Sequence, residues 1–262
     1  MNLSDVAVYI PAFNAENTLP RVFSLLPKIL RDEAGMVLVV DNASDDNTSE
    51  IAQREAIKNR VANFVLIRNS TNQGYGGSQK IGYQEVIKRG FNRVIMLHGD
   101  AQYSPSHALQ LLKESETFDY DLLFGSRING NALAGGMPWH RYIGNRSLTY
   151  IQNMLLQTKI SEFHSGYRVY KTSALKGIPL ERLSSDYHFD TEIIICMIDE
   201  RMSIGEVPIP TRYANEKNYV NIWGYGVSIL RSTSSYFMHK KGIRTSPKWG
   251  EILGSVNSSR RK

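Results

Sequence analysis

Three polar side chains stand at alternate positions directly after a short apolar run. Residues 94–97 indicate a buried strand, and His98, Asp100 and Gln102 follow it before Pro105 starts a turn. In an extended chain alternate side chains point the same way, so these three groups are expected to converge at the carboxyl end of the strand. Ligands bind at that edge of open α/β sheets, and a carboxylate beside an amide oxygen suits a hard divalent cation that also takes phosphate oxygens. The plain alternative is a polar loop with a solvated Asp100.

Polar clusters also follow the other runs that are expected to form strands. These short apolar runs are residues 6–10, 36–40 and 63–67. The segments between them carry helical periodicity, which indicates an α/β fold with a doubly wound, mostly parallel sheet. The carboxyl ends of parallel strands meet at one edge, so segments 11–14, 41–48 and 72–78 are expected to lie beside Asp100.

Each of these clusters has its own chemistry and its own structural alternative. Residues 44–48 suit a helix cap, whereas Asp41 stands at the strand end before that cap. The glycine-rich turn 72–78 opens a helix, and such a turn lets backbone N–H groups approach a phosphate. Its spacing matches neither the dinucleotide fingerprint nor the Walker loop.

The second half of the chain carries basic groups and a further carboxylate. A strand over residues 121–127 is expected to end in Arg127, and a helix over 139–156 carries Arg141 near its start. Asp190 precedes an apolar helix and is either a catalytic carboxylate or the N-cap of that helix. A last edge strand is expected over residues 203–213 because it contains two prolines.

The composition is that of a globular protein with a mild basic excess. The 262 residues are 42% hydrophobic and 21% charged, with 31 Lys and Arg against 25 Asp and Glu, a net charge of +6. This excess suits phosphate-bearing ligands or an anionic membrane surface, and no nucleic-acid motif is present. A single cysteine, Cys196, excludes a disulfide within the chain and points to a cytoplasmic, reducing compartment. Neither a secretory signal nor a membrane-spanning run is expected.

The end of the chain has a different character. Residues 219–242 mix aromatic and aliphatic side chains with few charges and end in His239, Lys240 and Lys241. This composition favours an amphipathic helix that either lies on a membrane or packs on the domain. Residues 255–262 are polar and basic, and they are expected to be disordered.

Together, these segments resemble the family 2 glycosyltransferases, which have the GT-A fold. Segments 11–14, 41–48, 72–74 and 98–102 occur in the order of that family. Three further pieces resemble the polyprenyl-phosphate sugar synthase branch, which includes the dolichyl-phosphate mannose synthases: Gly125-Ser-Arg127, Ser165-Gly-Tyr-Arg168 and Phe189-Asp190. The resemblance implies a Rossmann-like nucleotide-sugar half over 1–105, an acceptor half over 106–215 and a helical tail over 216–262.

The resemblance also implies roles for individual residues. The nucleotide-binding set is Pro11, Ala12, Phe13, Asn14, Asp41, Asn42, Ser44, Gly74 and Asp100. Within it, Asp41 is expected to accept a hydrogen bond from the base. The acceptor-binding set is Arg127, Arg141, Ser165, Gly166 and Arg168, and the catalytic set is Asp100, Arg127 and Asp190.

The same resemblance implies Mg²⁺ or Mn²⁺ as the cofactor. Asp100 is its expected ligand, assisted by Gln102 and His98. The family usually has Asp at position 98, and histidine suits Mn²⁺ better than Mg²⁺. Ala15 also replaces an acidic residue that is common in the family after the Asn, so the base stays open.

Three functions follow from this interpretation. The first is an inverting, metal-dependent transfer of a sugar from a UDP- or GDP-sugar to a polyprenyl phosphate at the cytoplasmic face of a membrane. The acceptor would be anionic already, so it needs basic partners rather than a strong general base. The second is transfer to a sugar hydroxyl in a cell-surface glycan, with Asp190 as the base. The third is a non-catalytic pseudo-transferase that binds nucleotide or scaffolds partners. A membrane surface and a membrane-protein partner both stay open as binding partners.

Overall fold

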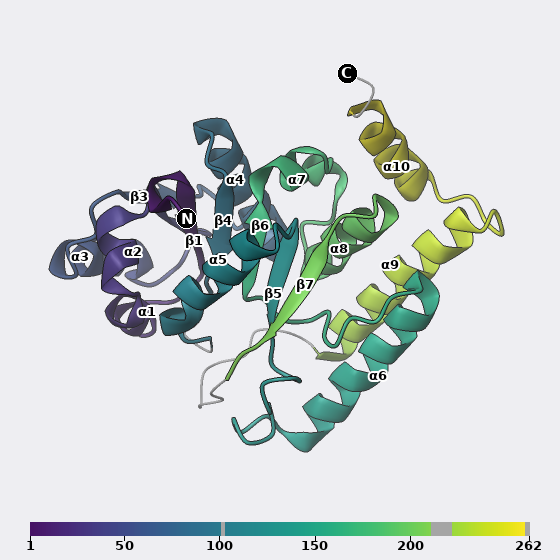
Figure 1. Cartoon of the computed structure of the whole chain (residues 1–262), viewed down its shortest axis with the longest axis horizontal. Coiled ribbons are helices and arrows are strands. Elements are labelled where there is room, and N and C mark those ends of the chain that lie inside the picture. The colour runs from purple at the N-terminus through teal and green to yellow at the C-terminus, as the bar shows by residue number, and fades with distance from the viewer. Residues whose placement is uncertain (101–102, 211–221, 260–262) are drawn as a thin grey trace.

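The computed structural model describes residues 1–100, 103–210 and 222–259 (Figure 1). Its strands are β1 Val6–Ala12, β2 Met36–Asp41, β3 Phe64–Arg68, β4 Arg93–Met96, β5 Leu122–Ser126, β6 Arg168–Lys171 and β7 Ile204–Pro208. Its helices are α1 Leu19–Leu25, α2 Lys28–Glu33, α3 Thr48–Lys58, α4 Gly74–Arg89, α5 Ala108–Thr117, α6 Trp139–Leu156, α7 Thr172–Lys176, α8 Phe189–Asp199, α9 Ile222–Lys240 and α10 Pro247–Ser259. Short 3₁₀ turns lie at Leu3–Asp5, Pro105–His107 and Leu180–Arg182.

The strands form one sheet in the order β3-β2-β1-β4-β6-β5-β7. Neighbouring strands run parallel except at β6, which lies antiparallel between β4 and β5. The expected mostly parallel α/β sheet is therefore confirmed. Because β6 is reversed, its amino end lies at the same edge as the carboxyl ends of β4 and β5.

Helices cover both faces of the sheet, which explains the nearly continuous burial of its central strands. Every residue of β2 is buried, and β1 is buried except at Pro11. One core packs α1, α2, α3 and α5 on one face, and the other packs α4, α7 and α8 on the opposite face. Alternate residues of β1 enter the two cores, as the period of a strand requires.

The carboxyl end of the chain is packed on the domain. Tyr236 of α9 and Trp249 of α10 belong to the second of these cores, and their ring centroids lie 5.3 Å apart. This supports the packed-helix alternative for residues 222–240, whereas 219–221 lie outside the described residues. The expected disorder from residue 255 is wrong over 255–259, because α10 continues to Ser259.

Two expected segments differ in detail. The chain turns at Gly99 and Asp100 instead of staying extended, so the alternation after β4 does not hold. The last strand, β7, lies at the sheet edge as expected but covers Ile204–Pro208, and residues 211–213 are outside the described part. In the described residues, no helix is both long enough and apolar enough to span a bilayer.

Candidate active site

The ends of β1 and β2 bring the first polar cluster together. The parallel register pairs Ala12 with Asp41, so the two strands end level with each other. The Asn42 N–H donates to the Ala12 carbonyl at 2.9 Å, and the Asn14 N–H donates to Ser44 Oγ at 2.9 Å. Asn14 itself has a φ of 49°, a conformation that asparagine tolerates well. Four of the nucleotide-binding candidates therefore form one hydrogen-bonded corner with Asp41.

Asp41 is the buried centre of this corner. Its side chain has no exposed surface, and it accepts from the Ser44 N–H at 3.0 Å and from the Ser49 hydroxyl. The Arg68 Nε lies 3.9 Å away. This geometry does not support the expected direct hydrogen bond to a base, because the carboxylate holds the loop between β2 and α3 instead.

Asn42 joins this corner to the glycine-rich turn. Its amide donates to Asn72 Oδ1 at 2.9 Å and to the Gly74 carbonyl at 3.2 Å. Its carbonyl oxygen accepts from Asn69 Nδ2 at 2.8 Å and from the Gln73 N–H at 3.0 Å. Gly74 is thereby fixed beside the end of β2, where its assignment to nucleotide binding stays a prediction.

The amino end of α4 is closed by protein. The N–H groups of Gly76 and Gly77 donate to the Ser185 carbonyl, at 2.9 and 3.2 Å. A Cβ on Gly74 would lie 2.4 Å from that oxygen, and one on Gly76 would lie 2.6 Å from Phe189 Cβ. The glycines therefore allow α4 to pack closely on the segment before α8. In this structure the N–H groups of Gly76 and Gly77 donate to protein, so they do not support the expected phosphate cradle.

The loop after β4 places Asp100 beside the end of β1. The Gly99 N–H donates to the Pro11 carbonyl at 3.3 Å, and Thr18 Oγ1 donates to the Gly99 carbonyl at 2.5 Å. Asp100 is partly exposed at this turn, while Gln102 lies outside the described residues. No cluster of three His, Cys, Asp or Glu side chains suited to a metal occurs in the described part. A single carboxylate still fits Mg²⁺, which takes one or two carboxylates together with substrate phosphates.

His98 turns toward the acceptor half. A Cβ on Gly166 would lie only 1.9 Å from His98 Nε2, and this nitrogen is buried with no hydrogen-bond partner. The imidazole lies between the rings of Tyr75 and Tyr103, with centroids at 6.1 and 5.5 Å. Position 166 therefore needs glycine, since any larger residue would displace the ring. Metal ligation through Nε2 is not supported by this orientation.

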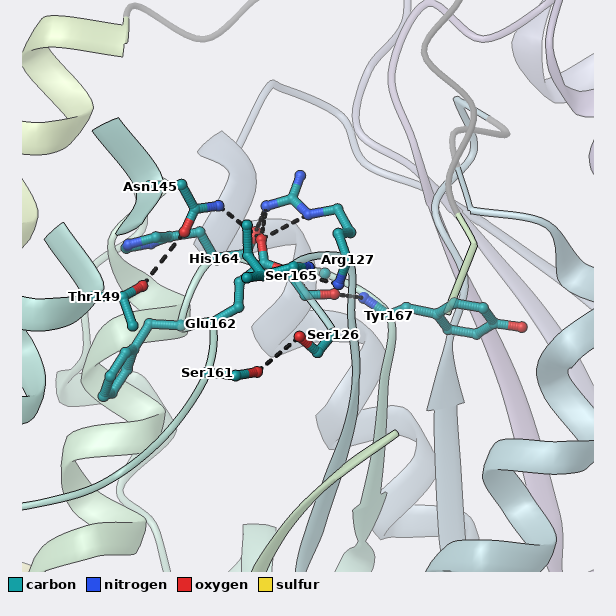
Figure 2. A network of polar contacts seen from close by, with 12 residues as sticks. Ser126, Arg127, Asn145, Thr149, Ser161, Glu162, His164, Ser165 and Tyr167 are labelled. Carbon is teal, nitrogen blue, oxygen red and sulfur yellow. Dashed lines mark hydrogen bonds and ion pairs between the residues drawn. The ribbon is translucent and has the colours of Figure 1, made fainter. Parts of the chain in front are cut away.

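Arg127 and Glu162 form a buried ion pair at the end of β5. Figure 2 shows Arg127 and Asn145 converging on the Glu162 carboxylate. The Arg127 N–H and Nε donate to it at 2.8 and 2.7 Å, and Asn145 Nδ2 donates at 2.7 Å. The Arg127 Nη2 also donates to the His164 carbonyl at 3.0 Å, and the guanidinium lies 5.9 Å from the Tyr103 ring centroid. Contacts with Glu162, the His164 carbonyl and the Tyr103 ring thus fix the position of Arg127, the candidate acceptor arginine.

The electrostatics of this pair favour the charged form of the carboxyl. Burial opposes ionisation of Glu162, but the charge of Arg127 and the donated hydrogen bonds outweigh it, so its pKa lies below the usual range. Burial lowers the pKa of the adjacent His164 to about 4, so its imidazole is neutral at pH 7. Sequence reasoning missed Glu162. The sequence does contain a feature that singles this residue out: Glu162 is the sole acidic residue between Asp121 and Glu181.

A second buried ion pair joins Arg168 to Asp190, with Nη1 3.2 Å from Oδ1. Asp190 also accepts from the Tyr75 hydroxyl at 3.0 Å and from Gln79 Nε2 at 3.1 Å. It lies in the first turn of α8, after the N-cap His188, so the N-cap alternative is wrong. Its carboxylate is held by an arginine and two neutral donors.

Arg168 faces the interior. Its side chain is 1% exposed, and it donates to the carbonyls of Ser165 at 2.8 Å and Phe163 at 3.2 Å and to the Tyr170 hydroxyl at 3.1 Å. The structure therefore does not present this guanidinium to an acceptor, contrary to the role implied by the resemblance. It shapes the loop that carries the other acceptor candidates.

The remaining acceptor candidates lie around this loop. Ser165 is buried, and its Oγ accepts from the Tyr167 N–H at 3.4 Å. The Gly166 N–H donates to the Tyr103 hydroxyl at 3.3 Å. Arg141 lies in the first turn of α6, partly exposed. Their contact with an acceptor stays a prediction.

In open, mostly parallel sheets ligands bind outside the carboxyl ends of the strands, which is where the polar residues of this site gather. The family model for "Glycosyl transferase family 2" matches residues 7–178, and the chain belongs to this family. The prediction of a sugar-transferring enzyme is thereby confirmed at the level of class.

Two relatives are similar over most of the chain. One is the UDP-N-acetylglucosamine--dolichyl-phosphate N-acetylglucosaminyltransferase of Methanococcus voltae, with 26% identity over 80% of this chain and 88% of the relative. The other is the polyprenol monophosphomannose synthase of Mycolicibacterium smegmatis, with 28% identity over 77% of this chain and 75% of the relative. Both match the polyprenyl-phosphate sugar synthase branch that the sequence indicated.

Solved structures confirm the GT-A fold. The glucosyl-3-phosphoglycerate synthase of Mycobacterium tuberculosis, in complex with Mn²⁺, UDP and glucosyl-3-phosphoglycerate, superposes with a TM-score of 0.64. The match covers 90% of this chain and 78% of that one at 14% sequence identity. The same enzyme in complex with Mg²⁺ and UDP also gives a TM-score of 0.64.

Proposed function

We propose that this protein is an inverting glycosyltransferase that uses Mg²⁺ or Mn²⁺ and transfers a sugar from a UDP- or GDP-sugar to a polyprenyl phosphate at the cytoplasmic face of a membrane. Membership of family 2 supports sugar transfer. The two relatives named for dolichyl-phosphate and polyprenol-phosphate products support a lipid phosphate as the acceptor. The solved relatives with Mn²⁺ or Mg²⁺ and UDP support the metal and a nucleoside diphosphate.

One observation carries the choice of acceptor. Two buried carboxylates of the acceptor half, Glu162 and Asp190, are each held by an arginine. Glu162 in particular is a weak proton acceptor: although burial opposes its ionisation, its pKa is lowered by the charge of Arg127 and by donated hydrogen bonds, and neutralising it would leave the Arg127 charge uncompensated. A hydroxyl acceptor needs a base, whereas a phosphate acceptor is ionised at neutral pH and needs none. This geometry therefore favours the phosphate.

The chemistry is a single displacement. A phosphate oxygen of the acceptor attacks the anomeric carbon, the bond from that carbon to the diphosphate oxygen breaks, and the configuration inverts. Asp100 would hold the divalent cation, which when bound neutralises charge on the departing diphosphate. Arg127, positioned by Glu162, would bind and orient the acceptor phosphate, and Arg141 would add a second cation.

The test is a transfer assay with the purified full chain. It uses Mg²⁺ or Mn²⁺, radiolabelled UDP- and GDP-sugars and a short-chain polyprenyl phosphate. We expect label in an organic-extractable, acid-labile product, and we expect Arg127→Ala to reduce transfer by about 100-fold or more, since a charged hydrogen-bond donor to the reacting group is lost. Arg54→Ala is the matched control, because Arg54 is an exposed arginine of α3.

The opposite pattern would overturn the acceptor assignment. Transfer to a glycan hydroxyl without labelled lipid would do so, above all if Asp190→Asn abolished it, because that result would make Asp190 a base. Donor binding that needs no metal and survives Asp100→Ala would contradict the assignment of Asp100. Absence of donor binding with either metal would leave the non-catalytic alternative in its scaffolding form.

A further inference from the structure

Tyr225 brings an aromatic ring and a hydroxyl from α9 into the acceptor half. It is half-buried in the first turn of the helix, and its hydroxyl lies 3.3 Å from His164 Nδ1. The two rings meet edge to face, with centroids 5.7 Å apart and an interplanar angle of 75°. The contact therefore joins two segments that are 61 positions apart along the chain.

His164 contacts both this hydroxyl and the candidate acceptor arginine. Its backbone carbonyl accepts from Arg127 Nη2 at 3.0 Å, while its ring nitrogen Nδ1 faces Tyr225. Figure 2 shows His164 next to Arg127 and Glu162. One residue thus places a cationic donor and a neutral hydroxyl in the same part of the site.

The charges of the acceptor half act on the Tyr225 hydroxyl. Burial raises the pKa of this phenol above its usual range, the charge of Asp190 raises it further, and the charges of Arg168 and Arg127 lower it. The hydroxyl is therefore protonated at neutral pH and can donate a hydrogen bond. It also lies close enough to feel both buried ion pairs of the site.

A series of ring contacts holds Tyr225 from its other side. The Tyr225 and Tyr187 centroids lie 6.4 Å apart, and Tyr187 stacks on Tyr75 with centroids 5.0 Å apart. From Tyr75 the contacts continue through His98 to Tyr103, the ring against which the acceptor arginine lies. The phenol is therefore fixed by packing as well as by its hydrogen bond, as a binding group that must meet a ligand in one position requires.

We propose that the Tyr225 hydroxyl donates a hydrogen bond to the acceptor phosphate beside Arg127, and that His164 positions this hydroxyl. The inference rests on the proposed function, since it assigns a further residue to the same acceptor site. Oxygens of an ionised phosphate only accept hydrogen bonds, so the hydroxyl must donate to them. Its own oxygen then accepts from His164 Nδ1, which requires the neutral imidazole to carry its proton on Nδ1 and not on Nε2. Tyr225 touches the acceptor, whereas His164 acts through Tyr225.

The experiment is calorimetric titration of the full chain with a short-chain, water-soluble prenyl phosphate in the absence of donor. We expect Tyr225→Phe to bind it at least about tenfold more weakly than wild type, because a hydrogen bond to a charged group is lost, and we expect an unchanged KM for the donor. Tyr236→Phe is the matched control: it removes a hydroxyl from the same helix that donates to Asp199, and it should bind the prenyl phosphate as wild type does. His164→Asn keeps an amide donor and should bind more tightly than His164→Leu.

Three results would overturn the assignment of Tyr225. They are equal affinities of wild type and Tyr225→Phe, an equal loss in Tyr236→Phe, and a His164 proton on Nε2 in the ¹⁵N spectrum of the complex with prenyl phosphate. Each of them leaves the proposed function standing, because wild type still binds the acceptor. A wild-type protein that binds no prenyl phosphate would instead contradict the proposed function, and this inference with it.

Discussion

Glu162 shows how a single side chain can set the geometry of an acceptor site. It has no exposed surface, it receives hydrogen bonds from two side chains on different elements, and it fixes both the backbone and the guanidinium of Arg127. A long arginine side chain otherwise has many rotamers, and ordering it costs free energy at each binding event. Glu162 orders Arg127 when the protein folds, so this loss of side-chain entropy does not recur at each binding event. It is a positioning residue, because it acts through Arg127.

Replacing Glu162 by Gln keeps the shape and removes the charge. We expect the free energy of unfolding to fall by about 3 kcal/mol, because the Arg127 charge stays largely buried without its partner. We also expect a raised KM for the acceptor with a smaller change in the KM for the donor. Denaturant unfolding and transfer assays at varied acceptor concentration measure both effects.

The stability effect should depend on pH in one direction. The pKa of Glu162 is lower in the folded state than in the unfolded state. The carboxylate therefore contributes its full stabilisation at pH values above its pKa in the unfolded state, and this contribution is lost as the pH falls through its pKa in the folded state. The difference between wild type and Glu162→Gln should therefore shrink below about pH 4. Glu206→Gln is the control, since Glu206 accepts only from Ser161 in the described contacts. An equal rise in acceptor KM in both variants would contradict the positioning role.

At the scale of the elements, the start of α4 depends on glycine for its close packing. Gly76→Ala would place a methyl group 2.6 Å from both Phe189 Cβ and the Ser184 carbonyl. Neither atom is the end of a flexible side chain, so α4 and the segment before α8 must separate. We expect a loss of about 1–3 kcal/mol in the free energy of unfolding, as for other overpacked sites. Chemical denaturation measures it.

Gly144→Ala on α6 is the matched substitution. A Cβ there would meet nothing within 4 Å, and alanine in a helix is more favourable than glycine by about 0.5–1 kcal/mol. The two variants should therefore change the free energy of unfolding in opposite directions. The same sign in both would show that the contact between α4 and the α8 segment does not limit the fold.

The elements also show what the sequence could predict. Helix α6 was predicted over its observed length, because Pro138 precedes it and its periodicity is regular. The strands of the first half were predicted to within a residue or two because each is a short apolar run that precedes a turn. The end of α10 was missed because its polar residues carry little pattern, and because the helix is held by a tertiary contact of Trp249 with Tyr236 of α9.

The candidate site was likewise predicted in part. Sequence placed Asn14, Asn42 and Ser44 at one edge, because the ends of parallel strands must meet there. It could not show that Asp41 and Arg168 face inward, since burial of a charged group depends on partners such as Ser49 and Asp190. Charged residues are mostly exposed, so a prediction made without knowledge of these partners places such side chains at the surface.

At the scale of the whole molecule, the last two helices are part of the fold. Glu192 of α8 is fully buried and accepts from Ser232 of α9 at 2.9 Å, from Lys248 of α10 and from the Ser184 N–H at 2.7 Å. Tyr236 of α9 donates to Asp199 at 2.5 Å. The carboxyl-terminal helices thus supply hydrogen-bond and charged partners to Glu192 and Asp199 of α8.

Ending the chain before α10, after Gly242, should therefore destabilise the whole domain. The truncation removes Trp249 and Ile252 from the core and Lys248 from Glu192. We expect a loss of about 3–5 kcal/mol, the usual cost of removing a large core residue or one partner of a buried pair. Thermal unfolding followed by circular dichroism measures it. An unchanged midpoint would mean that residues 243–262 are an independent tail.

The position of β6 has a consequence for the growing chain. Strands β1 to β4 can pair once residue 96 has emerged from the ribosome, but β5 pairs only with β6 and β7 in the described sheet. Its neighbours are separated from it by some forty residues or more, so β5 waits with both edges unpaired until β6 arrives at residues 168–171. Open strand edges template association between chains. Ribosomal release ahead of β6 thus yields a fragment prone to aggregate, and the interval between β5 and β6 is the vulnerable period of biosynthesis.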